Sequence, residues 1–314
     1  MTIQNPLPFF SIILPTYNRG HMVVTAIQSV VHQKFEDWEL IIIDDGSTDN
    51  TRQILAPFLS DTRINYNYQT NQERSAARNH GIEIAKGRYI CFLDSDDYYL
   101  PNHLEVLHNI IAAYNQKEGV YYSLCQFEKD GKRTNIKPMG KVVGNGIYNV
   151  LNKGLLLTNS VCVTASLLEN NKFPVHLSIF EDNHLWIRII CQSQLIIAEE
   201  VTNIVIEHSN RSLNYSAEDL DKKTKKYMQA VNDLFYEGKY PEIASCINED
   251  QKRTFIASKY IVMSYEAFNL LSVKLVYKYL YNSFRTKIIQ GKILDLLKLF
   301  FFSWIYIGIK RFFK

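Results

Sequence analysis

Arg88-Tyr-Ile-Cys-Phe-Leu-Asp-Ser-Asp-Asp97 joins a short apolar run to three carboxylates within four residues. The apolar run predicts a buried strand, and carboxylates crowded at its end repel one another unless they face water or surround a cation. Ligands of open α/β sheets bind at the carboxyl ends of strands, and hard divalent cations prefer oxygen ligands. The stretch therefore predicts a Mn²⁺ or Mg²⁺ site, with a solvated acidic turn before Pro101 as the alternative.

Two similar apolar runs precede this one, and polar residues follow each of them. Phe10–Leu14 leads into Pro-Thr-Tyr-Asn-Arg at 15–19, and Glu39–Ile43 leads into Asp-Asp-Gly-Ser-Thr-Asp at 44–49. Segments of helical periodicity separate the runs, which predicts an α/β fold with a mostly parallel, Rossmann-like sheet covered by helices on both faces. The three strand ends should then share one edge of the sheet, where their loops can form a single site.

The periodicity changes beyond about residue 210. Strands and helices alternate up to that point, whereas from Ser216 onward the pattern is helical throughout. This change predicts one domain over residues 1–215 and a helical C-terminal region over 216–314.

Composition and charge narrow the class of protein. The chain has 314 residues, 46% of them hydrophobic, with a net charge of +3. Residues 271–314 hold nine Lys or Arg and one acid, which leaves 26 basic and 31 acidic residues elsewhere. Because the basic excess is confined to this tail, we expect no nucleic-acid partner. Five scattered cysteines and the absence of an N-terminal signal pattern predict free thiols and a cytoplasmic location.

The three loops offer complementary chemistry for a nucleoside diphosphate. Tyr17 provides a flat ring for a base, Asp44 and Asp45 can accept hydrogen bonds from a base or ribose, and the acidic run can hold a cation for the phosphates. Neither G-x-G-x-x-G after the first strand nor G-x-x-x-x-G-K-[ST] is present, so the two glycine-rich phosphate cradles are excluded. A bound cation is then the expected means of neutralising the diphosphate.

Five motifs occur in a fixed order along the chain. They are Pro15-Thr-Tyr-Asn-Arg19, Ile43-Asp-Asp-Gly-Ser-Thr-Asp49, Ala77-Arg-Asn79 with Ala85-Lys-Gly-Arg-Tyr89, Asp94-Ser-Asp-Asp97, and Glu181-Asp182 with Trp186-x-Arg188. In these motifs, over roughly residues 10–212, the chain resembles the family 2 glycosyltransferases. The resemblance implies a GT-A fold and an inverting, metal-dependent enzyme that uses a nucleotide sugar. The family alone favours a UDP-sugar as this donor. Residues 1–100 would then bind the donor and 101–215 the acceptor, which would be a saccharide or a lipid-linked glycan.

The resemblance also assigns roles to individual residues. It places Tyr17 and Asp45 at the nucleobase, in a pocket shaped by Pro15 and Thr16, and it places Arg78 near the nucleotide. Asp94 would face the ribose and Asp96 would bind the metal, while Asp97 could share either duty. Core packing is the alternative for Tyr17, and an ordinary surface charge is the alternative for Arg78. His208, which follows a strand predicted over Val201–Glu207, is a candidate metal or phosphate ligand or a plain loop residue.

Glu181 and Asp182 are the candidates for the general base. They begin a predicted helix whose apolar stripe (Leu185, Trp186, Ile189, Ile190) would dock it and so fix both acids. A helix N-terminus favours the ionised carboxylate, which is the form that a base requires. The resemblance points to Asp182, and the alternative is that both acids only stabilise the helix end.

The C-terminal tail carries an uncharged apolar stretch of eleven residues, 299–309, between Lys298 and Lys310. This stretch is shorter than the roughly 20 apolar residues of a membrane-spanning helix. With the Lys and Arg around it, segment 293–314 predicts a helix on the inner face of the cell membrane; a helix packed on protein is the alternative. The alternative functions for the whole chain are a nucleotidyltransferase that makes sugar nucleotides and a non-catalytic nucleotide-sugar or glycan-binding module.

Overall fold

The computed structural model describes residues 7–134, 139–154, 156–207, 216–270 and 272–287. The chain divides into two compact units, Met1–His208 and Ser209–Lys314. The predicted apolar tail segment 293–314 and His208 lie outside the described residues.

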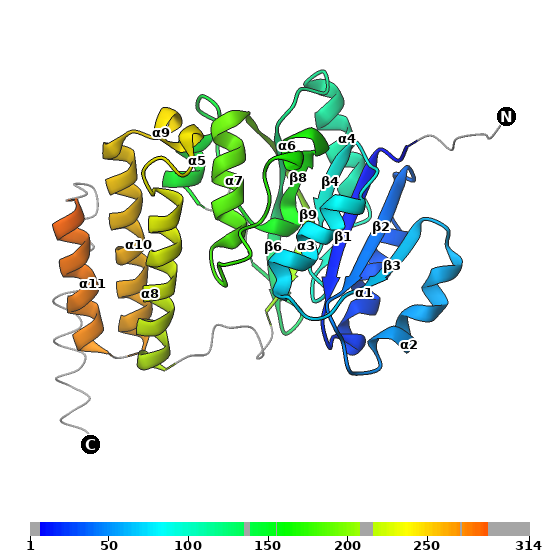
Figure 1. The fold of residues 1–314 in the computed structure, drawn as a ribbon, viewed down its shortest axis with the longest axis horizontal. Helices are drawn as coiled ribbons and strands as arrows, with labels where there is room; N and C mark the ends of the chain where they lie inside the picture. The colour runs from blue at the N-terminus through cyan, green and yellow to red at the C-terminus, as the bar shows by residue number, and fades with distance from the viewer. Residues whose placement is uncertain (1–6, 135–138, 155, 208–215, 271, 288–314) are drawn as a thin grey trace. The chain divides into compact units, whose positions relative to one another are not determined.

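The first unit alternates strands and helices (Figure 1). Its strands are β1 (Phe10–Thr16), β2 (Trp38–Asp44), β3 (Ile64–Tyr68), β4 (Tyr89–Phe92), β5 (Tyr98–Tyr99), β6 (Val120–Lys129), β7 (Lys132–Arg133), β8 (Val161–Thr164) and β9 (Leu195–Ile206). Its helices are α1 (Gly20–Val31), α2 (Thr51–Leu55), α3 (Glu73–Ile84), α4 (His103–Ala113), α5 (Ile147–Asn152), α6 (Ala165–Glu169) and α7 (Glu181–Gln192), with 3₁₀ turns η1 (Ala56–Ser60) and η2 (Thr158–Ser160).

The described strands form one sheet in the order β3-β2-β1-β4-β8-β6-β9-β5, and β7 pairs with β6. The segment β3-β2-β1-β4 is parallel, which confirms the prediction for the three apolar runs. Beyond β4 the sheet is mixed, because β8 runs antiparallel to both β4 and β6 while β9 is parallel to β6. The strand predicted at Val201–Glu207 begins earlier, at Leu195, and its pairing with β6 shifts register after Ser123.

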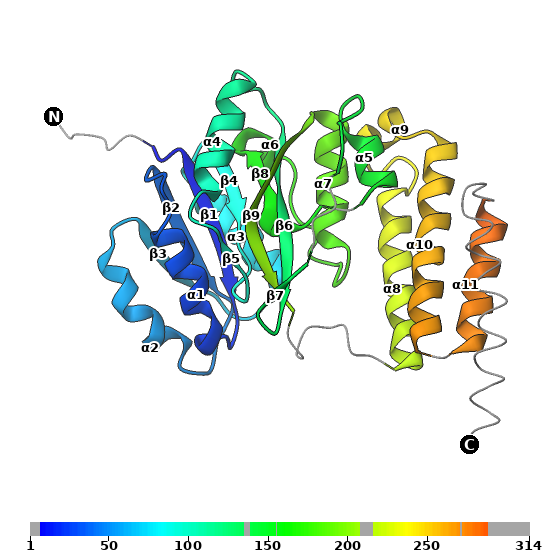
Figure 2. The ribbon, with the colours of Figure 1, turned by 180° about the vertical axis from the view of Figure 1, so that it is seen from behind.

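Helices cover both faces of the sheet, as the near-continuous apolar strands predicted. Alternating side chains of β1 and β2 point to opposite faces of the sheet and contribute to two hydrophobic clusters. Ile12 and Leu40 pack with α1 and α4 on one face, whereas Ile41 and Ile43 pack with Ala77 of α3 on the other. Figures 1 and 2 show α3 and α1 on opposite sides of the sheet. Gly81 lets α3 approach closely, since a Cβ at this position would lie 2.5 Å from Ile13 Cγ2.

The second unit is helical in its described part, as predicted from Ser216 onward. It contains α8 (Ala217–Leu234), α9 (Pro241–Cys246), α10 (Glu249–Asn269) and α11 (Val273–Thr286), and α10 packs against both α8 and α11. Reciprocal capping boxes begin α8, from Ser216, and α10, from Asn248, so two backbone N–H groups, those of the N-cap residue and of the third helical residue, are satisfied at each helix. Among the described helices, none combines the length and the apolar character needed to cross a membrane.

Candidate active site

The carboxyl ends of β1, β2 and β4 meet at one edge of the sheet, as predicted from the parallel strand order. The amide of Asp45 donates to the carbonyl of Thr16 at 2.8 Å, and the amide of Leu93 donates to the carbonyl of Ile13 at 3.0 Å. The loops after the three strands therefore begin side by side.

Asn18 ties the first loop to the second. Its backbone lies in the left-handed region (φ 50°), which Asn tolerates better than most residues. Its Oδ1 accepts from the Thr48 amide at 2.8 Å, and its own amide donates to Ser47 Oγ at 2.9 Å. The adjoining Tyr17 is 47% exposed, so the core-packing alternative for this ring is wrong. Thr16 is buried, and its hydroxyl has no hydrogen-bond partner among the described residues.

The two acids of the second loop are both buried. Asp45 Oδ1 accepts from Gln69 Nε2 at 2.6 Å and from the Gln72 amide at 2.9 Å. Asp44 instead accepts from the Tyr66 hydroxyl at 2.7 Å, and burial together with this hydrogen bond raises the pKa of Tyr66. Asp44 and Asp45 thus both accept hydrogen bonds that hold this loop, and Asp45 lies beside the Gln69 side chain.

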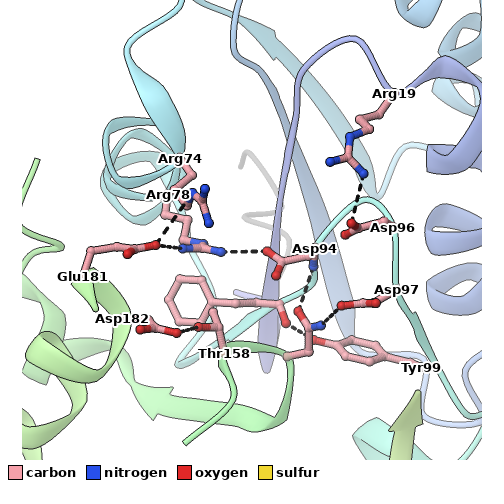
Figure 3. Close-up of polar contacts among 12 residues, drawn as sticks. Arg19, Arg74, Arg78, Asp94, Asp96, Asp97, Tyr99, Thr158, Glu181 and Asp182 are labelled. Atoms are coloured by element: carbon pink, nitrogen blue, oxygen red, sulfur yellow. Dashed lines mark hydrogen bonds and ion pairs between the residues drawn. The ribbon is translucent and has the colours of Figure 1, made fainter. Parts of the chain in front are cut away.

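The three acids after β4 have different partners (Figure 3). Asp94 Oδ1 accepts from Arg78 at 2.7 Å, and Asp96 Oδ2 accepts from Arg19 at 2.9 Å. Asp97 is buried, and it accepts from Asn159 Nδ2 at 2.5 Å and from the Ile206 amide at 2.8 Å. Mutual repulsion in the acidic run is thus relieved by two arginines and by buried donors, so the solvated-turn alternative does not describe it.

Arg78 is 4% exposed, which makes the surface-charge alternative wrong. Besides its bond to Asp94, its NH1 lies 3.5 Å from Glu181 Oε1, and its guanidinium stands 5.3 Å from the Phe173 ring centre. Burial by itself would lower the pKa of Arg78, but the charges of Asp94 and Glu181 hold it above its usual value. A buried cation is stable only with such partners.

Glu181 and Asp182 begin α7, and the predicted apolar stripe of this helix is fully buried. Phe180 precedes them at φ 65°, a strained conformation for a bulky residue that turns the chain sharply into the helix. Glu181 is buried and faces Arg78 and Arg74, and burial, together with the Asp182 charge, raises the pKa of Glu181. Asp182 is half-buried, and its Oδ2 accepts from Thr158 Oγ1 at 3.1 Å.

Several residues of this site carried no signal in the sequence. Thr158 and Asn159 come from η2, in a region where the sequence predicted only a mixed block, and they contact Asp182 and Asp97 respectively. Asn159 Oδ1 also accepts from the Asp94 amide at 2.8 Å. Arg19 belonged to a quoted motif, yet only the structure brings it to Asp96.

Comparison with known proteins agrees with this geometry. The profile described as Glycosyl transferase family 2 matches residues 11–163. The *Escherichia coli* protein named UDP-Glc:alpha-D-GlcNAc-diphosphoundecaprenol beta-1,3-glucosyltransferase WfgD is 35% identical over 184 residues, which are 57% of this chain and 69% of WfgD. The chain belongs to glycosyl transferase family 2. Membership of this family favours a glycosyltransferase over the nucleotidyltransferase and the binding-module alternatives.

Other proteins are similar to this chain over different lengths. A glycosyltransferase of *Rickettsia bellii* is 32% identical over 201 residues, which are 64% of this chain but only 29% of that longer protein. Among solved structures, *S. aureus* TarS 1–349 in complex with UDP-GlcNAc superposes with a TM-score of 0.67 at 19% identity, covering 89% of this chain and 81% of that one. The fold is therefore of the GT-A type, as predicted.

The residues at this edge fit a divalent cation in part. Among the described residues, no group of three or more His, Cys, Asp or Glu side chains is placed to hold a metal ion. Mg²⁺, however, is usually bound through one or two carboxylates, with water and substrate phosphates as the other ligands. The Asp96 carboxylate, already paired with a cationic group and 12% exposed, offers such a contact. The donor chemistry fits, and His208 lies outside the described residues.

Proposed function

We propose that this glycosyltransferase moves a sugar, with inversion, from a UDP-sugar to a hydroxyl of a saccharide or lipid-linked glycan, and that it needs Mn²⁺ or Mg²⁺. The observation that carries the proposal is that Asp94 and Asp96, from the loop after β4, lie in one polar cluster with Asp182, from the start of α7 (Figure 3). The name of WfgD, a UDP-Glc enzyme with a diphosphoundecaprenol-linked acceptor, supports the donor and acceptor classes.

In this proposal the donor lies across the ends of β1, β2 and β4. The exposed Tyr17 ring stacks on the base, Asp45 accepts from its polar edge, and Pro15 and Thr16 shape the pocket. Asp94 accepts from the ribose. Asp96 is the metal ligand, and Asp97, which is turned inward to Asn159 and Ile206, holds the loop in place.

We assign the general base to Asp182 and a supporting role to Glu181. Asp182 is the more exposed of the two and is oriented by Thr158, whereas Glu181 is buried against Arg78. The Asp182 carboxylate takes the proton of the acceptor hydroxyl while the hydroxyl oxygen forms a bond to the anomeric carbon. The bond from that carbon to the diphosphate oxygen breaks, and the nucleoside diphosphate leaves with the electron pair. A bound divalent ion would stabilise the charge that develops on this leaving group.

The test is to assay a panel of UDP-sugars for release of UDP, with and without a lipid-linked saccharide, in Mn²⁺ and in EDTA. We expect release that depends on acceptor and metal. Asp182→Asn should lower transfer about 10²–10⁴-fold, the range for positioned acid–base groups, while UDP affinity is unchanged. Glu200→Gln, at an exposed acid of β9, is the matched control. Transfer by Asp182→Asn at the wild-type rate would remove Asp182 as the base.

We also propose that segment 293–314 places the enzyme on the inner, cytoplasmic face of the membrane, where a lipid-linked acceptor is found. The support is the charge pattern of the tail, with Lys298 and Lys310 flanking an apolar stretch. The full chain should float with vesicles that contain anionic lipid, and a chain that ends at residue 292 should not, although it should still transfer sugar to a soluble acceptor. Equal flotation of both chains would overturn this assignment.

A further inference from the structure

Two halves of the cluster are joined through one buried cation. Arg78 NH2 is 2.7 Å from Asp94 Oδ1, and Arg78 NH1 is 3.5 Å from Glu181 Oε1. Asp94 follows β4 and Glu181 begins α7, so the only element common to both contacts is α3, which carries Arg78. Figure 3 shows the Arg78 guanidinium between the two carboxylates.

The two contacts are unequal. Asp94 receives a short hydrogen bond, whereas the Glu181 contact is an ion pair without one, since NH1 and Nε of Arg78 have no hydrogen-bond partner among the described residues. Unpaired buried donors of a charged group are costly. Asp94 and Glu181 therefore share one buried positive charge.

We propose that Arg78 is a positioning residue, a counter-ion shared by Asp94 and the Glu181–Asp182 pair, through which occupation of the donor site keeps the base ionised. The inference rests on the proposed function, because it takes Asp94 as the donor-side group and Asp182 as the base. In this proposal a ribose hydroxyl that donates to Asp94 weakens the attraction between Asp94 and Arg78. The Arg78 guanidinium then acts more strongly on Glu181 and Asp182.

The charges around the acid pair decide how its titration should change. Glu181 and Asp182 face each other as like charges, Arg78 and Arg74 come from α3, and His184 lies one turn along α7. Arg74 is 3.8 Å from Glu181 and 62% exposed, so water screens it far more than Arg78. Burial raises the pKa of Glu181 and the two arginines oppose that rise, which is consistent with Arg78 as the stronger stabilising charge.

The experiment is the pH dependence of kcat/KM, whose acid limb reports the base of the free enzyme. In Asp94→Asn, Arg78 has only Glu181 and Asp182 as anionic neighbours in this contact. The acid limb of the pH profile should then move to lower pH by about one unit, the size expected for a nearby charge. Arg78→Met should move it to higher pH by a similar amount. In the Arg78→Met background, Asp94→Asn should no longer shift the limb. The control, Arg74→Met, should move it much less.

Arg78 is buried, so Arg78→Met can fail to fold. Arg78→Lys keeps a cation but lacks the planar fork whose NH2 and NH1 face Asp94 and Glu181, so the acid limb of this variant should also move upward. A limb at the same pH in wild type, Asp94→Asn and Arg78→Lys would overturn the coupling while sugar transfer by the wild type still stands. Absence of transfer from every UDP-sugar tested would instead overturn the proposed function.

Discussion

Arg19 should compete with the metal for Asp96. The two side chains form a 2.9 Å ion pair and are 33% and 12% exposed, so the pair is intermediate between surface and interior. Fully exposed pairs contribute up to about 1 kcal/mol, and hydrogen bonds to charged groups about 1.5–3 kcal/mol. A value of about 1.4 kcal/mol corresponds to a factor of ten in affinity. We expect a cation at Asp96 to displace Arg19, so Arg19→Met should bind Mn²⁺ about tenfold more tightly.

Calorimetric titration of Mn²⁺ into the nucleotide-free protein measures this change directly. Thermal unfolding gives a second measure, since Arg19→Met should be less stable than wild type without metal and equal to it in saturating Mn²⁺. Arg63→Met is the matched control, because Arg63 also pairs with an aspartate, Asp61, but outside this cluster. Unchanged Mn²⁺ affinity in Arg19→Met would refute the competition, and undiminished affinity in Asp96→Asn would refute Asp96 as the ligand.

Three further outcomes follow from named contacts. Burial lowers the pKa of His103 to about 3, so below pH 6.5 the unfolded chain binds a proton that the native state does not bind. At pH 5 this difference should lower the free energy of unfolding by about 2 kcal/mol. In His103→Asn, urea unfolding measured at several pH values should show a correspondingly smaller loss of stability between pH 6.5 and pH 5. Asn159→Ala removes a donor from buried Asp97 and should lower stability by about 1–3 kcal/mol; an unchanged urea midpoint would contradict this. Tyr17→Ala should weaken UDP binding by about 1–3 kcal/mol, seen by calorimetry, and leave the melting temperature unchanged.

The His103 prediction depends on a tautomer that the contacts define. Thr202 Oγ1 donates its one proton to Ser123 Oγ at 2.7 Å, so it can only accept from His103 Nδ1, which is 2.7 Å away. The other ring nitrogen, Nε2, is buried and finds no hydrogen-bond partner in the described part of the chain. A second proton there would put a charge on the buried ring, and this cost of burial is why the native state resists protonation.

Much of the nucleotide side was predictable because its signals are local. An apolar run that ends in polar residues predicts a strand and its loop, and the parallel order of β1, β2 and β4 then places Tyr17, Asp45 and Asp94 at one edge. The mixed half of the sheet was not predictable in the same way. Short apolar strands such as β8 have the same pattern whether they pair parallel or antiparallel, and only their neighbours decide.

The amino-acid sequence by itself determined the family, the alternation of strands and helices, and which acids stand at strand and helix ends, because each of these is a property of neighbours along the chain. Only the tertiary structure decided the partners of those acids: Arg19 for Asp96, Asn159 for Asp97, and Arg78 between Asp94 and Glu181. These partners lie far apart in sequence and meet because burying the two faces of the sheet brings their elements together. The sequence tells which side chains can carry a charge. How strongly such a charge interacts depends on its burial and on the group it faces, and both are properties of the packed fold.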